Sequence, residues 1–135
     1  MPWQNQLRGD SLSWLLEADS PGVRYLAVRD LVDDVTEAEL STAREAAYRD
    51  GPIPTILENM STEGYWAKEG PGYNPKYRST VWALIMLAQL GASTQQDERI
   101  ARACSYLLDH ALTEGGQFSM SGTPSGTIDC LQGNL

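Results

Sequence analysis

Three aromatic residues fall within residues 61–76, a stretch rich in glycine and proline, and two more follow soon after. They are Tyr65, Trp66, Tyr73, Tyr77 and Trp82. The faces of aromatic rings attract cations, so a pocket lined by these side chains could stabilise positive charge on an apolar ligand. This stretch is longer than the usual ~4–6 residues of a connection. Long connections are often functional or packed around their own aromatic side chains. We take the five residues as the candidate ligand-binding set, and packing against helix ends is the alternative interpretation.

Asp129, Cys130 and His110 are weak candidates for a metal site, because a carboxylate, a thiolate and an imidazole can together bind a transition metal. A zinc site of the Cys/His kind needs four ligands at a recognisable spacing, which is absent here. We expect instead that Asp129 lies in the first turn of a helix and His110 near a helix C-terminus, both favourable places for their charge. Cys130 is expected to be a small buried residue. The sequence therefore predicts no metal and no cofactor.

Asp30, Asp33 and Asp34 could act as paired carboxylates, one of them holding a proton for acid catalysis. The interpretation we favour is a solvated acidic surface at a helix end.

The charge balance excludes several classes of partner. Among 135 residues, 10 are basic and 18 acidic, for a formal net charge of −8. Without a basic cluster, neither nucleic acid nor an anionic membrane surface is an expected partner. The most apolar stretch, residues 81–90, is far shorter than the roughly 20 residues of a membrane span, and no secretion signal precedes it. We expect a single domain over residues 1–135 in the cytoplasm, with both cysteines as free thiols.

Helical spacing of apolar residues runs through most of the chain. It predicts helices over about residues 21–33, 37–49, 53–60 and 78–90, one that follows a Ser93–Gln96 capping box and ends at about residue 111, and the beginning of another at 128–135. The helix over 78–90 is apolar on nearly every side, so we expect it to be buried, with Met60 and Met86 in the core. No segment has the pattern of a strand. The predicted fold class is all-α.

The two halves of the chain carry a similar turn. Aligning Gly64 with Gly116 also aligns Trp66 with Phe118, at an offset of 52 residues. In both places an acidic residue and glycine precede an aromatic residue. Helical hairpins repeated in this way bury a continuous core between neighbours. We predict one repeat over about residues 20–66, a second over about 77–118, and an incomplete third from about 128.

This pattern resembles the terpenoid-cyclase and protein-prenyltransferase superfamily, the squalene–hopene-cyclase-like α/α toroids, over about residues 20–135. The repeat of that family carries a glutamine a few residues before Gly-x-Trp. Here Gly64-Tyr65-Trp66 matches the Gly-x-Trp part, and Glu58 or Asn59 stands near the place of the glutamine. The segment 77–84 looks like the inner helix that begins the next repeat. The resemblance implies a fragment or short version of an α/α toroid.

The chemistry of that family is not matched residue by residue. The Asp-x-Asp-Asp motif of its cyclases is absent, and Asp129-Cys130 lacks the one-residue spacing of the zinc-binding motif in its prenyltransferases, while His110 precedes it. We therefore expect a helical module without complete catalytic machinery, which binds an apolar small molecule or a protein partner, with self-association as one way to cover its end. The alternative is part of an isoprenoid-processing enzyme, a terpene cyclase or prenyltransferase-like protein, whose remaining active-site residues lie outside this chain. Whether the protein is an enzyme stays open.

Overall fold

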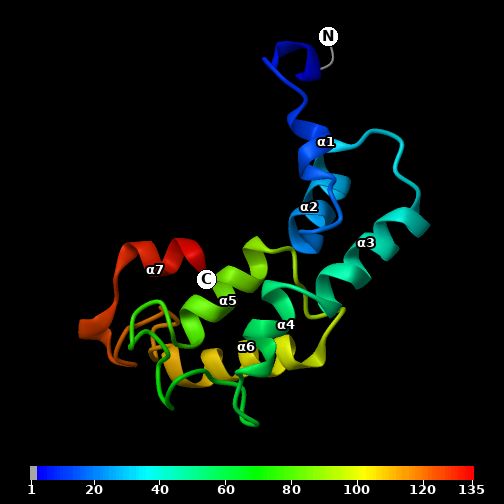
Figure 1. Cartoon of the computed structure of the whole chain (residues 1–135). Helices are drawn as coiled ribbons and strands as arrows, with labels where there is room; N and C mark the ends of the chain where they lie inside the picture. The colour runs from blue at the N-terminus through cyan, green and yellow to red at the C-terminus, as the bar shows by residue number, and fades with distance from the viewer. Residues whose placement is uncertain (1–2) are drawn as a thin grey trace. The chain divides into compact units, whose positions relative to one another are not determined.

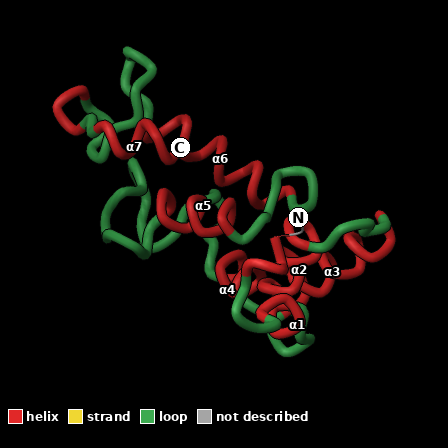
Figure 2. The backbone as a smooth tube through the Cα atoms, turned by 90° about the horizontal axis from the view of Figure 1, so that it is seen from above, coloured by secondary structure: helices red, strands yellow, loops and turns green. Residues whose placement is uncertain are grey.

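The computed structural model describes residues 3–135, and helices dominate it (Figure 1). The α-helices within these residues are α1 Ser11–Leu15, α2 Pro21–Leu31, α3 Glu37–Arg49, α4 Pro52–Glu58, α5 Thr80–Gln89, α6 Glu98–Ala111 and α7 Asp129–Asn134. Two short 3₁₀ helices lie at Trp3–Gln6 and Pro124–Gly126. The described residues contain no strand, only two isolated bridges, Leu112 with Phe118 and Ser119 with Thr127 (Figure 2). The predicted all-α class is confirmed.

The chain divides into two compact units, residues 1–55 and residues 56–135. We call them the N-terminal unit and the C-terminal unit. The division falls within α4. Among the described helices, none combines the length and the apolarity needed to traverse a bilayer.

In the N-terminal unit, α2 and α3 pack against each other. Tyr25, Ala27 and Val28 of α2 and Ala43 and Ala47 of α3 are buried. Alanine at the contact positions of α3 lets the two helices approach closely, because almost no side chain separates the backbones.

The predicted capping box opens α3. Thr36 Oγ1 accepts a hydrogen bond of 3.3 Å from the backbone N–H of Glu39, and Glu39 Oε2 accepts one of 2.9 Å from the N–H of Thr36. Two N–H groups that the helix itself leaves without a partner are thereby satisfied. This is why α3 begins where the sequence predicts.

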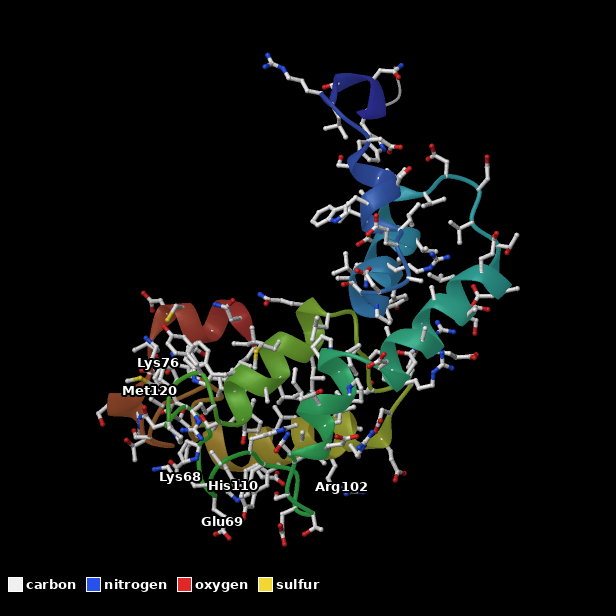
Figure 3. All side chains as sticks on the ribbon, viewed as in Figure 1. Lys68, Glu69, Lys76, Arg102, His110 and Met120 are labelled. Atoms are coloured by element: carbon white, nitrogen blue, oxygen red, sulfur yellow. The ribbon has the colours of Figure 1, made fainter. Side chains whose placement is uncertain are left out.

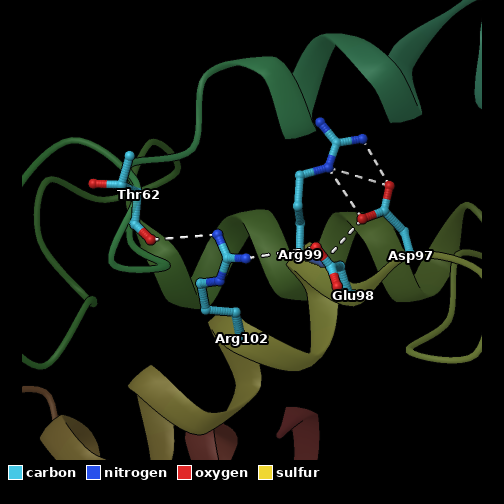
Figure 4. A network of polar contacts seen from close by, with 5 residues as sticks. All are labelled: Thr62, Asp97, Glu98, Arg99 and Arg102. Atoms are coloured by element: carbon cyan, nitrogen blue, oxygen red, sulfur yellow. Dashed lines mark hydrogen bonds and ion pairs between the residues drawn. The ribbon is translucent and has the colours of Figure 1, made fainter.

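The start of α6 differs from the prediction. The side chains of Ser93 and Gln96 do bond to each other, but the helix begins later, at Glu98. Asp97 is the N-cap, and its carboxylate accepts a 2.9 Å hydrogen bond from the backbone N–H of Arg99 while also pairing with the Arg99 guanidinium at 2.7 Å (Figure 4). The charged carboxylate caps the helix and neutralises an arginine at once, so it is the stronger N-terminal signal.

In the C-terminal unit, α5 packs on α6, and the core lies between them. The buried residues of this core include Val81, Ala83, Leu84 and Leu87 from α5 and Ile100, Ala103, Leu107 and Ala111 from α6. Met86 is 40% exposed, so the prediction that it lies in the core is wrong. One side of α5 is open to solvent despite its apolar sequence.

Candidate functional site

The candidate site is built on a turn that occurs twice in the C-terminal unit, first after α4 and again after α6. In the first copy, the N–H of Ser61 donates to the carbonyl of Tyr65 (2.8 Å) and the N–H of Gly64 to that of Ser61 (3.2 Å). In the second, Thr113 donates to Gln117 and Gly116 to Thr113, both at 2.9 Å. The two turns therefore have the same backbone hydrogen bonds at the offset of 52 residues.

The side chains of the two turns also correspond. Ser61 Oγ accepts from the N–H of Tyr65 (3.0 Å), and Thr113 Oγ1 accepts from that of Gln117 (3.3 Å). Gly64 and Gly116 have φ of 104° and 75°, a region of the backbone map that favours glycine. A hydroxyl residue at the start and a glycine at the fourth position are the local causes of this turn.

Each turn is tied to the helix that follows it. The backbone N–H of Trp66 donates to Thr80 Oγ1 of α5 at 3.2 Å, and that of Phe118 donates to Gln132 Oε1 of α7 at 2.8 Å. The acceptor lies 14 residues after the donor in both cases. These bonds hold an aromatic residue against the next helix, at the first residue of α5 and at the fourth residue of α7. These hydrogen bonds do not show where each of the three repeats begins and ends, so the repeat boundaries stay predictions.

The two copies differ in what covers them. A Cβ built on Gly64 would lie 3.0 Å from the backbone oxygen of Arg102 in α6. The Arg102 guanidinium donates to the carbonyl of Thr62 (Figure 4), and the rings of Tyr65 and Tyr106 are 5.3 Å apart. The first turn is therefore packed on the middle of α6.

Gly116, in the second turn, is exposed, and a Cβ built on it would meet no described atom within 4 Å beyond its chain neighbours. Within the described residues, no helix stands to this turn as α6 stands to the first. The second copy has the same internal geometry without the cover.

An apolar groove of about 490 Å³ is lined in part by Phe118, the residue that follows the second turn, and we call it the C-terminal groove. Its lining comes from α5, α6 and the segment around α7, and includes Leu84, Ile85, Ala88, Ile100, Cys104, Leu107, Leu108, Phe118 and Leu135. Leu108 is 49% exposed. The thiol of Cys104 is the one ionisable side chain of the lining, and burial raises its pKa, which keeps it neutral.

The five aromatic candidates do not line this groove, and they do not form one pocket. Trp66 is only 5% exposed, and its Nε1–H donates to the carbonyl of Ile56 at 2.7 Å. This placement is that of an aromatic residue packed on a helix end. The ring of Tyr65 contacts the ring of Tyr106, which in turn stacks on His110 with ring centroids 3.9 Å apart.

Tyr73, Tyr77 and Trp82 form a separate cluster. The Trp82 ring centroid lies 5.3 Å from that of Tyr73 and 4.7 Å from that of Tyr77. Lys76 Nζ lies 5.1 Å from the centroid of the Tyr77 ring, so the lysine of the chain itself occupies the place of a ligand cation. A hydrogen bond with Tyr77 raises the pKa of Lys76. Lys76 and His110, which mark the two aromatic groups, lie apart in Figure 3.

The candidate metal ligands are not brought together. No group of three His, Cys, Asp or Glu side chains in the described part of the chain could hold a metal ion. Asp129 lies in the first turn of α7 and His110 in the last turn of α6. Cys130 is exposed, so the prediction that it is buried is wrong. The short α7 buries Leu131 instead, and the neighbouring Cys130 points to a different side of the helix.

The three acidic candidates lie at the end of α2. Asp30 pairs with Arg29 at 2.7 Å, and this hydrogen bond lowers the pKa of Asp30. Asp33 and Asp34 are exposed and line a groove of the N-terminal unit that is described below.

No protein-family model, curated protein sequence or solved structure matches this chain. The resemblance to the α/α toroids therefore stays a prediction.

Sequence reasoning missed the residues of the C-terminal groove. Phe118 was noticed only as the aromatic residue that aligns with Trp66. The signal that could have pointed to this region is the repeat itself, because the second turn has the glycine and the aromatic residue of the first.

Proposed function

We propose that this chain is a helical repeat module without complete catalytic machinery, and that it binds an amphipathic helix of a protein partner in the C-terminal groove. One observation carries the proposal. The turn at Gly64 is packed on α6, whereas the equivalent turn at Gly116 is uncovered, and Phe118, two residues after Gly116, lines an apolar groove.

The partner is inferred from what the first turn binds. That turn packs on the side of α6 that carries Arg102, Ala103 and Tyr106, and Ile100, Ala103 and Leu107 are among the residues that this helix buries. Because the two turns share their backbone geometry, a helix of the same kind has the shape that fits the second. A groove between helices that takes the apolar face of another helix is a common mode of recognition.

The chemistry of the groove supports an apolar contact. Its lining has no acidic or basic side chain, and burial of Leu108 and Phe118 by a bound helix would remove further apolar surface from water. A volume of about 490 Å³ would also admit a small apolar molecule, which is the competing occupant.

The experiment uses the intact chain and a fluorescein-labelled peptide of residues 97–112, the helix that fits the first turn. Fluorescence anisotropy measures its dissociation constant with the unaltered chain, with Leu108→Gln and with Met86→Gln. Met86 is the matched control, since it is 40% exposed on α5 and does not line the groove. We expect Leu108→Gln to weaken binding about tenfold, as the loss of one well-buried contact does, and Met86→Gln to leave it unchanged.

Equal weakening by the two variants, or none by either, contradicts the proposal. Binding of a fluorescent fatty acid that Leu108→Gln abolishes, without binding of the peptide, would identify a small apolar ligand instead. A dimer in light scattering that dissociates on Leu108→Gln would identify a second copy of the chain as the occupant.

The alternative of an isoprenoid-processing enzyme needs acid or metal-binding residues from outside this chain. It stays open as a prediction, and zinc bound stoichiometrically to the purified protein would favour its prenyltransferase version.

A further inference from the structure

A second groove lies in the N-terminal unit, along the packed pair of α2 and α3, and we call it the N-terminal groove. It has a volume of about 530 Å³, and α2, α3 and the connection between them supply most of its lining. It is independent of the C-terminal groove, because all of its lining residues belong to the N-terminal unit.

The floor of this groove is apolar. It is made by small and β-branched side chains: Val28, Val32, Val35, Ala38, Ala43 and Ala46. Small side chains on α3 leave room above them for the larger apolar side chains of an incoming segment. Ala38 is exposed, so part of this floor is open to solvent.

The charged residues of the lining are three acids and one base: Asp33, Asp34, Glu39 and Arg24. The Arg24 guanidinium donates to the carbonyl of Leu16, which also lines the groove. Glu39 is held in place by the capping box, and its hydrogen bonds with Thr36 lower its pKa. Neither Asp33 nor Asp34 makes an ion pair with any other described residue. The lining therefore has an excess of negative charge that the described chain does not neutralise.

We propose that the N-terminal groove binds a basic amphipathic helix of a protein partner, with apolar side chains on the valine and alanine floor and lysine or arginine side chains against Asp33 and Asp34. The groove is the site, and its charge selects the occupant. Two parallel features of such a helix, an apolar stripe and a basic edge, match the two parts of the lining. The C-terminal groove has no acidic side chain and lacks this preference.

Two fluorescein-labelled synthetic peptides of equal length test the proposal against the full chain by fluorescence anisotropy. Both carry leucine at the same helical positions, and the remaining positions are lysine in one and glutamate in the other. We expect the lysine peptide to bind at least about tenfold more tightly, and its affinity to fall as the salt concentration rises, because exposed charges are screened.

The double variant Asp33→Asn/Asp34→Asn removes the two free carboxylates without a change of shape. Asp34 has a φ of 58°, and asparagine tolerates this conformation well. We expect about tenfold weaker binding of the lysine peptide and a smaller dependence on salt. The matched control is Glu45→Gln/Asp50→Asn, which removes the same charge from exposed positions of the same unit outside the groove. It should leave the affinity within about twofold of the unaltered chain.

A third variant, Ala38→Leu, fills the floor at constant charge and should weaken binding as well. Equal affinity for the two peptides overturns the proposal, because it means that the acidic side chains do not select the peptide. Equal weakening by the double variant and its control overturns it as well, because it means that the peptide is attracted to the net charge of the chain and not to the groove. Weakening by Leu108→Gln would place the peptide in the C-terminal groove and would overturn it too. The two proposals are separated if the double variant binds the lysine peptide more weakly but still binds the peptide of residues 97–112 with unchanged affinity.

Discussion

Gly64 lies against the backbone of Arg102, with 3.0 Å between the position of a Cβ on Gly64 and the carbonyl oxygen of Arg102. Residues in contact here are 38 positions apart in the sequence (102 minus 64), so the contact joins the first turn to α6. Gly116, at the same place in the second turn, has no such neighbour among the described residues. The glycine of the first turn thus serves both a backbone conformation and a close approach, and that of the second turn serves only the conformation.

The first prediction compares alanine at these two glycines. Both substitutions place a Cβ at positive φ, which costs roughly 1–2 kcal/mol. Only Gly64→Ala also pushes a methyl group against backbone, for which overpacking adds about 1–3 kcal/mol. We expect Gly64→Ala to be clearly more destabilising than Gly116→Ala in urea denaturation of the intact chain. Equal losses would contradict the packing of the first turn on α6.

The second prediction concerns the aromatic residues of the two turns. Trp66 is 5% exposed, and truncation of a buried tryptophan to alanine destabilises by about 3–5 kcal/mol. Phe118 is only partly buried, so Phe118→Ala should cost less than half as much. The free energy of unfolding from chemical denaturation is the measurement. A loss below about 1 kcal/mol for Trp66→Ala would contradict its role as a buried repeat aromatic.

Local features of the fold were predictable from the sequence. The Thr36 and Glu39 side chains, Pro21 at the first position of α2, and the glycines at 64 and 116 act through neighbours in the chain, so their effect on the backbone is readable from spacing alone. Two local signals compete at the start of α6, which is why the predicted N-cap at Ser93 was wrong. Ser93 and Asp97 are both good N-caps four residues apart, and what favours Asp97 is its ion pair with Arg99, two residues later, which the capping-box pattern does not include.

The candidate site was less predictable, because it depends on contacts between distant segments. Tyr65 and Trp82 belong to different aromatic groups, since Tyr65 meets Tyr106 of α6 whereas Trp82 meets Tyr73 and Tyr77. Proximity in the sequence had suggested one pocket. The C-terminal groove was missed for a related reason, because the presence or absence of a covering helix is a property of packing and not of any segment.

The third prediction concerns acid. In the folded chain, the pKa of Asp97 lies below its ordinary value of 3.8. The largest cause is the hydrogen bonding of the Arg99 side chain to the Asp97 carboxylate. The unfolded chain therefore binds more protons than the folded chain as the pH falls below about 4. The stabilisation by the charged Asp97 is complete above that pH, and it is lost progressively as the pH falls through the lowered pKa of the folded state.

Asp97→Asn isolates this effect, because asparagine is as good an N-cap as aspartate but carries no charge. We expect the variant to be less stable than the unaltered chain at pH 7 and to lose less stability between pH 5 and pH 3, as measured by urea denaturation at each pH. Asp109→Asn is the control, since Asp109 is an exposed acid of the same helix that makes no ion pair with other described residues. If Asp97→Asn lost as much stability in acid as the unaltered chain, the Asp97–Arg99 pair would not contribute to folding. A shallower loss that the control does not reproduce would show that the ion pair which sets the start of α6 also stabilises it.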